Sequence, residues 1–216
     1  MKYGESTFDI IYLIFAIAMG LGILRKRKDT AGKLMGSAVL LLGFGDAFHL
    51  IPRVLNYFAD ADFTAWLGFG KLVTSVTMTV FYLLMYRLWL NVYGERENGK
   101  LSAVVYGLTV IRILLCLFPQ NRWFQNEGSV HWGILRNIPF VALGVIIVWL
   151  YRRRRAEEPC FRTVWILVTL SFLFYIPVAV AASLVPMLGM LMLPKTVCYM
   201  LLIRIFWKYA SAGSER

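Results

Sequence analysis

The strongest constraint on this chain is the near absence of charge from seven stretches of about 20 residues each. Charged residues make up 16% of the sequence, against roughly 25% in soluble domains. A bilayer core about 30 Å thick needs roughly 20 apolar residues per helix, so seven spans use almost all of the 216 residues. The sequence therefore predicts an all-α, polytopic membrane protein in which residues 1–216 form a single transmembrane domain.

The seven predicted transmembrane helices lie between short charged or polar breaks. They are expected at Ile10–Leu24, Leu34–Tyr57, Ala65–Tyr86, Leu101–Phe118, Trp132–Leu150, Arg162–Leu184 and Met187–Trp207. Six or eight helices are the alternatives, because the first stretch is short and only Val185 and Pro186 divide the last two apolar runs. No basic segment precedes the first helix and no small-residue cleavage site follows it, so no removable signal peptide is expected.

Basic residues predict the orientation of these helices. The loops after the first, third and fifth helices carry Arg25–Lys28, Arg96, Lys100 and Arg152–Arg155, whereas the opposite loops carry only Arg122. Cytoplasmic loops are rich in Lys and Arg, so the N-terminus is expected outside the plasma membrane and the C-terminus in the cytoplasm. The net charge of +11 is thus a topology signal, and nucleic acid is not an expected partner.

A weak internal repeat divides the chain into two three-helix halves, 1–100 and 132–208, joined by a linker helix at 101–119. Each half has a basic helix end, then Phe48-His-Leu-Ile-Pro52 or Phe174-Tyr-Ile-Pro177, then a helix ending in an arginine and a tryptophan. This topology resembles the SWEET, PQ-loop and KDEL-receptor group, although the matching helices lack a proline-glutamine motif. The stretches GFGDAFHLIPR, GFGKLVTSVTMT, RNIPF and MLMLPKT also resemble an uncharacterised family of multi-pass proteins of Gram-positive bacteria.

Polar side chains inside the predicted helices mark a candidate ligand site, because an ionisable group there costs roughly 3 kcal/mol on insertion scales. Asp46, His49 and Arg53 share one face of the second helix and are expected to contact one another. The candidate ligand-binding residues are Asp46, His49, Arg53, Lys71, Arg112, Arg136, Asn137, Tyr175 and Lys195. Counting along the helices places them in the outer half of the membrane, which predicts one shared cavity.

The charge of this predicted cavity is unbalanced. Its five cations face a single acid, Asp46, so either a lysine is neutral or an anion belongs in the cavity. Prolines within the helices would leave backbone carbonyls free to face the site, and Pro194 is expected near the middle of the last helix. The prolines in question are Pro52, Pro139, Pro177 and Pro194.

Structural interpretations compete with the ligand site. Arg53 and Arg136 lie near enough to the surface to snorkel, and Asp46 could serve only as a counter-ion for Lys71 or Lys195. His49 could simply hydrogen-bond a neighbouring helix. Small residues usually mark close contacts between membrane helices, and the glycines expected to do so are Gly43, Gly45, Gly68, Gly70 and Gly144.

Three functions fit these residues. A transporter would bind a small anionic or zwitterionic solute, with Asp46 and His49 as a proton-coupling pair. A receptor or sensor would bind an anion or lipid headgroup without a path across the membrane. A lipid-modifying enzyme would use Asp46 and His49 as acid and base, but the chain lacks the histidine-rich metal set of alkaline-ceramidase-like hydrolases.

Cofactors and metals are not expected. Cys116, Cys160 and Cys198 have neither metal-ligand spacing nor a paired framework. Lys195 stands in the last helix, as the retinal-binding lysine of opsins does, but its neighbour Pro194 and the lack of a second acidic counter-ion argue against retinal. The expected partners are the lipid bilayer and a small anionic solute or lipid headgroup.

Overall fold

The computed structural model describes residues 2–59, 61–97, 99–125, 130–181 and 185–212. Within these ranges the chain is helical, without strands, and seven helices are long and apolar enough to cross a bilayer. They are α1 (Lys2–Lys26), α2 (Thr30–Phe58), α3 (Thr64–Val92), α4 (Gly99–Leu117), α5 (Val130–Arg153), α6 (Val164–Ala181) and α7 (Met192–Ala212). The predicted fold class is confirmed, and the protein is an integral membrane protein.

Two helices begin elsewhere than predicted. Helix α1 starts at Lys2 rather than Ile10, so Glu5 and Asp9 lie within it. Helix α7 starts at Met192, after the short 3₁₀ helix Pro186–Leu191. The expectation that Pro194 lies near mid-helix is therefore wrong: it stands in the first turn of α7, where a missing backbone donor costs nothing.

The described ends of the other helices lie within four residues of the predicted ones, except that α3 continues from the predicted Tyr86 to Val92. Helix α2 begins after Asp29, whose side chain accepts a hydrogen bond from the backbone N–H of Gly32 at 2.8 Å. The Arg27 guanidinium donates to the same carboxylate and lowers the pKa of Asp29. The predicted end of the sixth helix at Leu184 lies outside the described residues.

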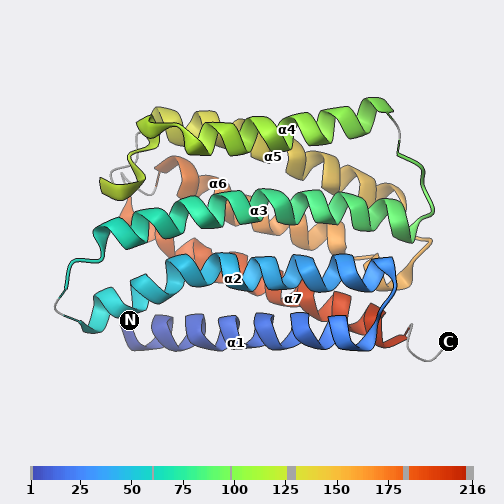
Figure 1. Cartoon of the computed structure of the whole chain (residues 1–216), viewed down its shortest axis with the longest axis horizontal. Coiled ribbons are helices and arrows are strands. Elements are labelled where there is room, and N and C mark those ends of the chain that lie inside the picture. Colours follow the sequence, from blue (N-terminus) through green and yellow to red (C-terminus); the bar gives the residue numbers. More distant parts are fainter. Residues whose placement is uncertain (1, 60, 98, 126–129, 182–184, 213–216) are drawn as a thin grey trace.

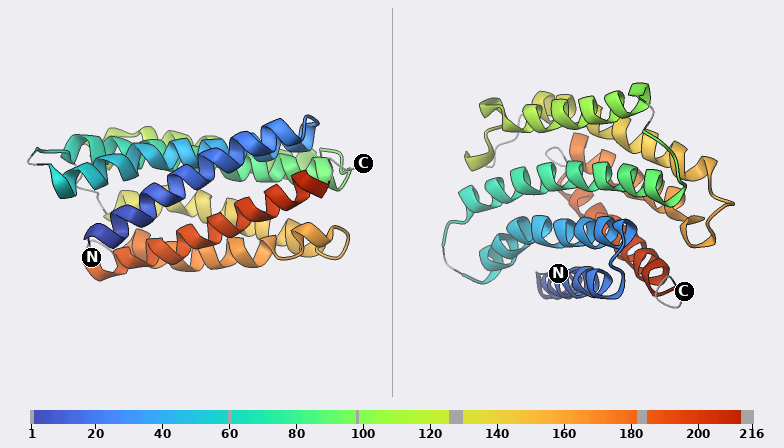
Figure 2. Two further views of the ribbon diagram at one scale, coloured as in Figure 1. Left: turned by 90° about the horizontal axis from the view of Figure 1, so that it is seen from below. Right: turned by 45° about the vertical axis from the view of Figure 1, so that its right-hand side comes forward.

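The seven helices form a ring in chain order. Each helix packs against its neighbours in sequence, and α1 also packs against α7, which closes the ring (Figure 1). Seen from below, α2, α3 and α4 lie in one layer and α6 and α7 in another, while α1 crosses obliquely between them (Figure 2). The termini lie at opposite ends, as an odd number of spans requires. We call the end where α1 starts the N-terminal end, and the other the C-terminal end.

Large aromatic residues fill the C-terminal half of the ring, and two of them satisfy their polar atoms inside the protein. Trp89 Nε1 donates to the carbonyl of Leu150 at 3.1 Å, and the Tyr151 hydroxyl donates to the carbonyl of Met85 at 3.1 Å. Both aromatic side chains are buried. Because such polar tips find partners inside the protein, this half forms a closed core.

The order of packing is the same in the two predicted halves: α2 lies between α1 and α3, and α6 lies between α5 and α7. Helix α4 packs against α3 and α5, in the position of a linker. The division at 1–100 and 132–208 stays a prediction.

The glycines expected at helix contacts do lie at close approaches. A Cβ atom added to Gly45 would meet the Thr77 side chain at 2.1 Å, and one added to Gly70 would meet the backbone of Phe48 at 2.1 Å. Added Cβ atoms at the remaining three glycines would come within 3.1 Å or less of a neighbour. These positions allow α2, α3 and the loop after α4 to pack at backbone distance.

The closest of these approaches yields a stability prediction. A Cβ atom at Gly68 would lie 1.4 Å from the carbonyl oxygen of Trp123, whereas one at Gly107 would meet nothing within 4 Å. We expect Gly68→Ala to destabilise the protein by about 1 to 3 kcal/mol through overpacking. Gly107→Ala is the matched control and should stabilise it by about 0.5 to 1 kcal/mol. Melting of the detergent-purified variants measures both, and equal midpoints would contradict the close contact.

Candidate functional site

A cavity of about 450 Å³ opens at the N-terminal end of the ring. Side chains of α2, α3, α4, α5, α6 and α7 line it. Seven of the nine candidate residues lie on its wall: His49, Lys71, Arg112, Arg136, Asn137, Tyr175 and Lys195. Lys71, Val130 and Val180 are exposed lining residues and mark its mouth. The structure thus brings together residues from six helices that are far apart in sequence.

The wall of this cavity is strongly cationic. Lys71, Arg112, Arg136 and Lys195 line it, and no Asp or Glu stands among the described lining residues. Thr74, Ser75, Asn137 and Tyr175 add neutral hydrogen-bonding groups, while Met78, Phe140 and Val178 supply apolar surface. We call this space the cationic cavity. A concave, mainly apolar wall with a few convergent polar groups is typical of small-molecule sites.

Arg112 is the most deeply buried of these cations, with 1% of its surface exposed. It comes from α4, donates through Nη1 to the backbone carbonyl of Arg136, and lies 5.0 Å from the centroid of the Phe140 ring. Its buried Nε has no hydrogen-bond partner among the described residues. A buried, unpartnered guanidinium N–H on the wall is a donor that an anion in the cavity could satisfy.

Arg136 is fixed by the loop that follows α4. Its Nη1 donates to Asn121 Oδ1 at 2.6 Å, and its guanidinium lies 4.3 Å from the centroid of a Trp123 ring. Asn121 Nδ2 donates to the carbonyls of Leu115 at 2.8 Å and Phe118 at 2.9 Å. The amide therefore satisfies the end of α4 and orients the arginine at the same time.

Asn121 and Trp123 are positioning residues that are not among the site residues predicted from the sequence. They follow the predicted fourth helix, where a loop is expected, and both are buried there. The available signal was Pro119, which starts a short 3₁₀ turn and brings the next polar residues back onto the helix end. A proline followed by a capping amide directly after a span is more typical of an ordered cap than of a free loop.

Lys195 stands on the opposite side of the cavity, in the first turn of α7. Its Nζ lies 5.1 Å from the centroid of the Tyr175 ring and 5.4 Å from that of Tyr199. The Tyr175 hydroxyl donates to Asn137 Oδ1 at 2.8 Å, which links α6 to α5. Two aromatic faces thus hold the ammonium group in place of direct ion pairing.

His49 completes the wall on the α2 side. Its Nδ1 is buried and has no hydrogen-bond partner among the described residues. Lys71 and Lys195 line the same cavity. A neutral imidazole next to cations can accept or donate one hydrogen bond to a bound solute.

Asp46 and Arg53 lie outside the cavity lining and face α1. Arg53 Nη2 pairs with Glu5 Oε1 and with Asp9 Oδ2, each at 2.8 Å. The Tyr12 hydroxyl donates to Asp46 Oδ2 at 2.7 Å. The expectation that Asp46 is the single acid within the spans is wrong, because the longer α1 brings Glu5 and Asp9 into the bundle and balances Arg53.

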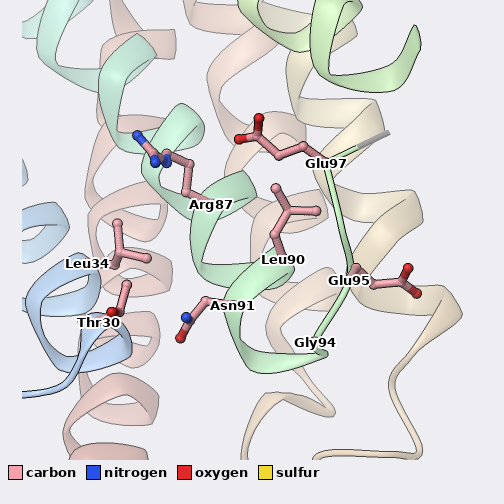
Figure 3. A pocket seen from close by; sticks show the side chains of 8 residues that line it. All are labelled: Thr30, Leu34, Arg87, Leu90, Asn91, Gly94, Glu95 and Glu97. Carbon is pink, nitrogen blue, oxygen red and sulfur yellow. The ribbon is translucent and has the colours of Figure 1, made fainter. Parts of the chain in front are cut away.

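A second hollow of about 400 Å³ lies at the C-terminal end, between the start of α2 and the end of α3 (Figure 3). Its charged lining residues are Arg87, Glu95 and Glu97, so its charge is mixed. Glu95 turns away from Arg87 in this view and pairs with Arg154. The wall of this hollow therefore carries both positive and negative charge, unlike the wall of the cationic cavity.

Comparisons of the chain with protein-family models, with curated proteins and with solved structures give no match. The fold and the cavity define the class of this protein. It is a seven-helix integral membrane protein with a cationic cavity at the N-terminal end.

Crowding of like charges in the cavity predicts an unusual effect of one substitution. Arg112→Met keeps an unbranched apolar stem and removes the guanidinium, one of four cations, so we expect the melting midpoint of the ligand-free protein to rise. Replacing buried ionic groups by apolar side chains that pack well is often neutral or stabilises a protein by roughly 1 to 4 kcal/mol. Arg87→Met, the same exchange at an exposed arginine of the C-terminal end, is the control and should leave the midpoint unchanged. A midpoint lower in Arg112→Met than in the control would show that the guanidinium contacts outweigh the repulsion.

Proposed function

We propose that this protein is a transporter that binds a small anionic or zwitterionic solute in the cationic cavity. The observation that carries the proposal is the wall of four cations without an acid among the described lining residues. Ionisable groups inside a membrane are costly unless their charge is offset. Arg112 and Arg136 line the cavity together, and a negative ligand there would offset their charge. The unpartnered Nε of Arg112 offers a hydrogen bond to that ligand.

The shape of the ring supports transport. The cavity opens at one end, while the aromatic core around Trp89 and Tyr151 closes the other, as in a carrier that exposes its site to one side at a time. Pro52, Pro139 and Pro177 lie inside α2, α5 and α6. Each removes a backbone hydrogen bond from its helix and supplies a point at which the helix can bend.

The proposed orientation places the cavity on the outside of the plasma membrane. The basic clusters Arg25–Lys28 and Arg152–Arg155 lie at the C-terminal end, which is cytoplasmic by the positive-inside rule. The proposal includes two resemblances. In sequence, the chain resembles multi-pass proteins of Gram-positive bacteria. In topology, it resembles the SWEET, PQ-loop and KDEL-receptor group.

A receptor or sensor is the second candidate function. The observation that favours it is the aromatic packing of the C-terminal half, where buried polar groups pair with one another, as Tyr86 and Ser102 do at 2.7 Å. In a sensor, an anion would bind to the same cations and shift the helices without crossing the membrane.

Binding and flux measurements test the proposal. We expect sulfate, phosphate, dicarboxylates or amino acids to raise the melting midpoint of the detergent-purified protein, and Arg136→Gln to weaken this effect. Loss of one charged hydrogen bond costs about 1.5 to 3 kcal/mol, or roughly tenfold or more in affinity. Arg87→Gln at the C-terminal end is the matched control.

The stabilising anion is then supplied in labelled form to proteoliposomes. A transporter accumulates it saturably and Arg136→Gln lowers uptake by the same factor as binding. Binding without uptake supports the sensor instead, and an absence of stabilisation by every anion would falsify both functions.

A further inference from the structure

Hydrogen-bonding side chains join α1 to α2 beside the cationic cavity. On α1, Glu5, Asp9 and Tyr12 follow one another at intervals of about one turn, and on α2, Asp46 and Arg53 lie two turns apart. Arg53 binds Glu5 and Asp9, each at 2.8 Å, and Tyr12 donates to Asp46 at 2.7 Å. We call these five residues the α1–α2 ladder.

The ladder is linked to the cavity through Lys195. Helix α2 contacts α7, and Asp46 attracts Lys195 electrostatically across this contact. Lys195 lines the cavity, whereas Asp46 does not. The charge of Asp46 therefore acts on a cation that faces the solute, although the carboxylate itself is turned toward Tyr12.

Nearby cations offset the two acids of α1. Arg53 pairs with both Glu5 and Asp9, and Lys2 Nζ lies 5.8 Å from the centroid of the Tyr57 ring, whose hydroxyl donates to Glu5. Asp46 instead faces Lys195 electrostatically and accepts a hydrogen bond from Tyr12. An anion next to Lys195 competes with Asp46 for the same ammonium group, and a buried carboxylate without a counter-charge is costly. One proton bound to Asp46 removes this cost.

We propose that Asp46 is a proton-binding site coupled to the cationic cavity, so that the protein takes up one proton with each anion. The proton comes from water and binds to a carboxylate oxygen of Asp46, and no other bond changes. A neutral Asp46 no longer offsets the charge of Lys195, so the anion binds more tightly. By reciprocity the bound anion raises the proton affinity of Asp46 to the same extent. This inference rests on the proposed anion site.

Other titratable and charged groups lie on α2 and on the helices that pack against it. They are Glu5, Asp9 and Tyr12 on α1, Lys71 and Tyr82 on α3, Lys195 and Tyr199 on α7, and His49, Arg53 and Tyr57 on α2 itself. Tyrosine, lysine and arginine ordinarily keep their protonation state between about pH 5 and pH 8. Glu5 and Asp9 are each paired with Arg53 at 2.8 Å. The competing assignment is therefore His49, which lines the cavity.

Sulfate titration of the detergent-purified full-length protein tests the coupling, because sulfate keeps its charge from about pH 5 to pH 8. The affinity is measured by thermal shift. In the wild type we expect it to rise on acidification by up to about tenfold per pH unit, the limit for one linked proton. Asp46→Asn, which keeps an oxygen for the Tyr12 hydrogen bond, should bind sulfate with an affinity independent of pH. Asp62→Asn, the same exchange in the exposed α2–α3 loop, should keep the slope of the wild type.

A second measurement does not depend on any variant. An indicator dye in weakly buffered solution should report about one proton taken up per sulfate bound by the wild type. Two results would overturn the proton site at Asp46. One is a wild-type sulfate affinity that is independent of pH. The other is a pH dependence of this affinity that persists in Asp46→Asn, and its loss in His49→Gln would then assign the proton to His49. Failure of sulfate to stabilise the wild type at any pH would instead contradict the anion cavity, so the two failures are distinguishable.

Discussion

Positive charge buried in a bilayer has to be held by dipoles, aromatic rings or a counter-ion, and this requirement organises the N-terminal half of the protein. Arg112 binds the backbone carbonyl of Arg136, Arg136 binds Asn121, and Lys195 lies against two tyrosine rings. These contacts fix the directions of the cations but leave their charge in place. In the proposed function, these contacts orient the cations before an anion arrives, which reduces the cost of ordering their side chains on binding.

The acids of the α1–α2 ladder and most cations of the cavity lie on different helices. The carboxylates lie on α1 and α2, whereas three of the four cavity cations lie on α3, α4 and α5. Lys195 on α7 belongs to both regions, since it attracts Asp46 and lines the cavity. A change of charge in the α1–α2 ladder can thus reach the solute without any contact between the ladder and the solute. This separation explains how a regulatory group can remain outside a cavity that it influences.

Much of the architecture was predictable from hydropathy, because seven apolar runs leave few alternatives in a bilayer. The shared cavity was predictable too, since costly polar residues such as Arg112 and Lys195 fell at one depth on different helices. The length of α1 was not: Glu5 and Asp9 make its start look polar, and only the position of Arg53 on α2 shows that these acids are paired inside the bundle. The role of Asn121 was equally hidden, because a capping amide depends on the path of a loop and not on periodicity.

The contrast between the two halves also determines which parts of the ring can move at low cost. The C-terminal half is fixed by buried aromatic groups such as Trp89 and Tyr151, whose hydrogen bonds would be lost on opening. The N-terminal half is open, and prolines interrupt α2, α5 and α6. In the proposed function, an anion bound among Arg112, Arg136 and Lys195 would offset the repulsion between these cations. Movement should therefore begin at the N-terminal end, and transport requires that the gain from closing there exceed the cost of loosening the aromatic core.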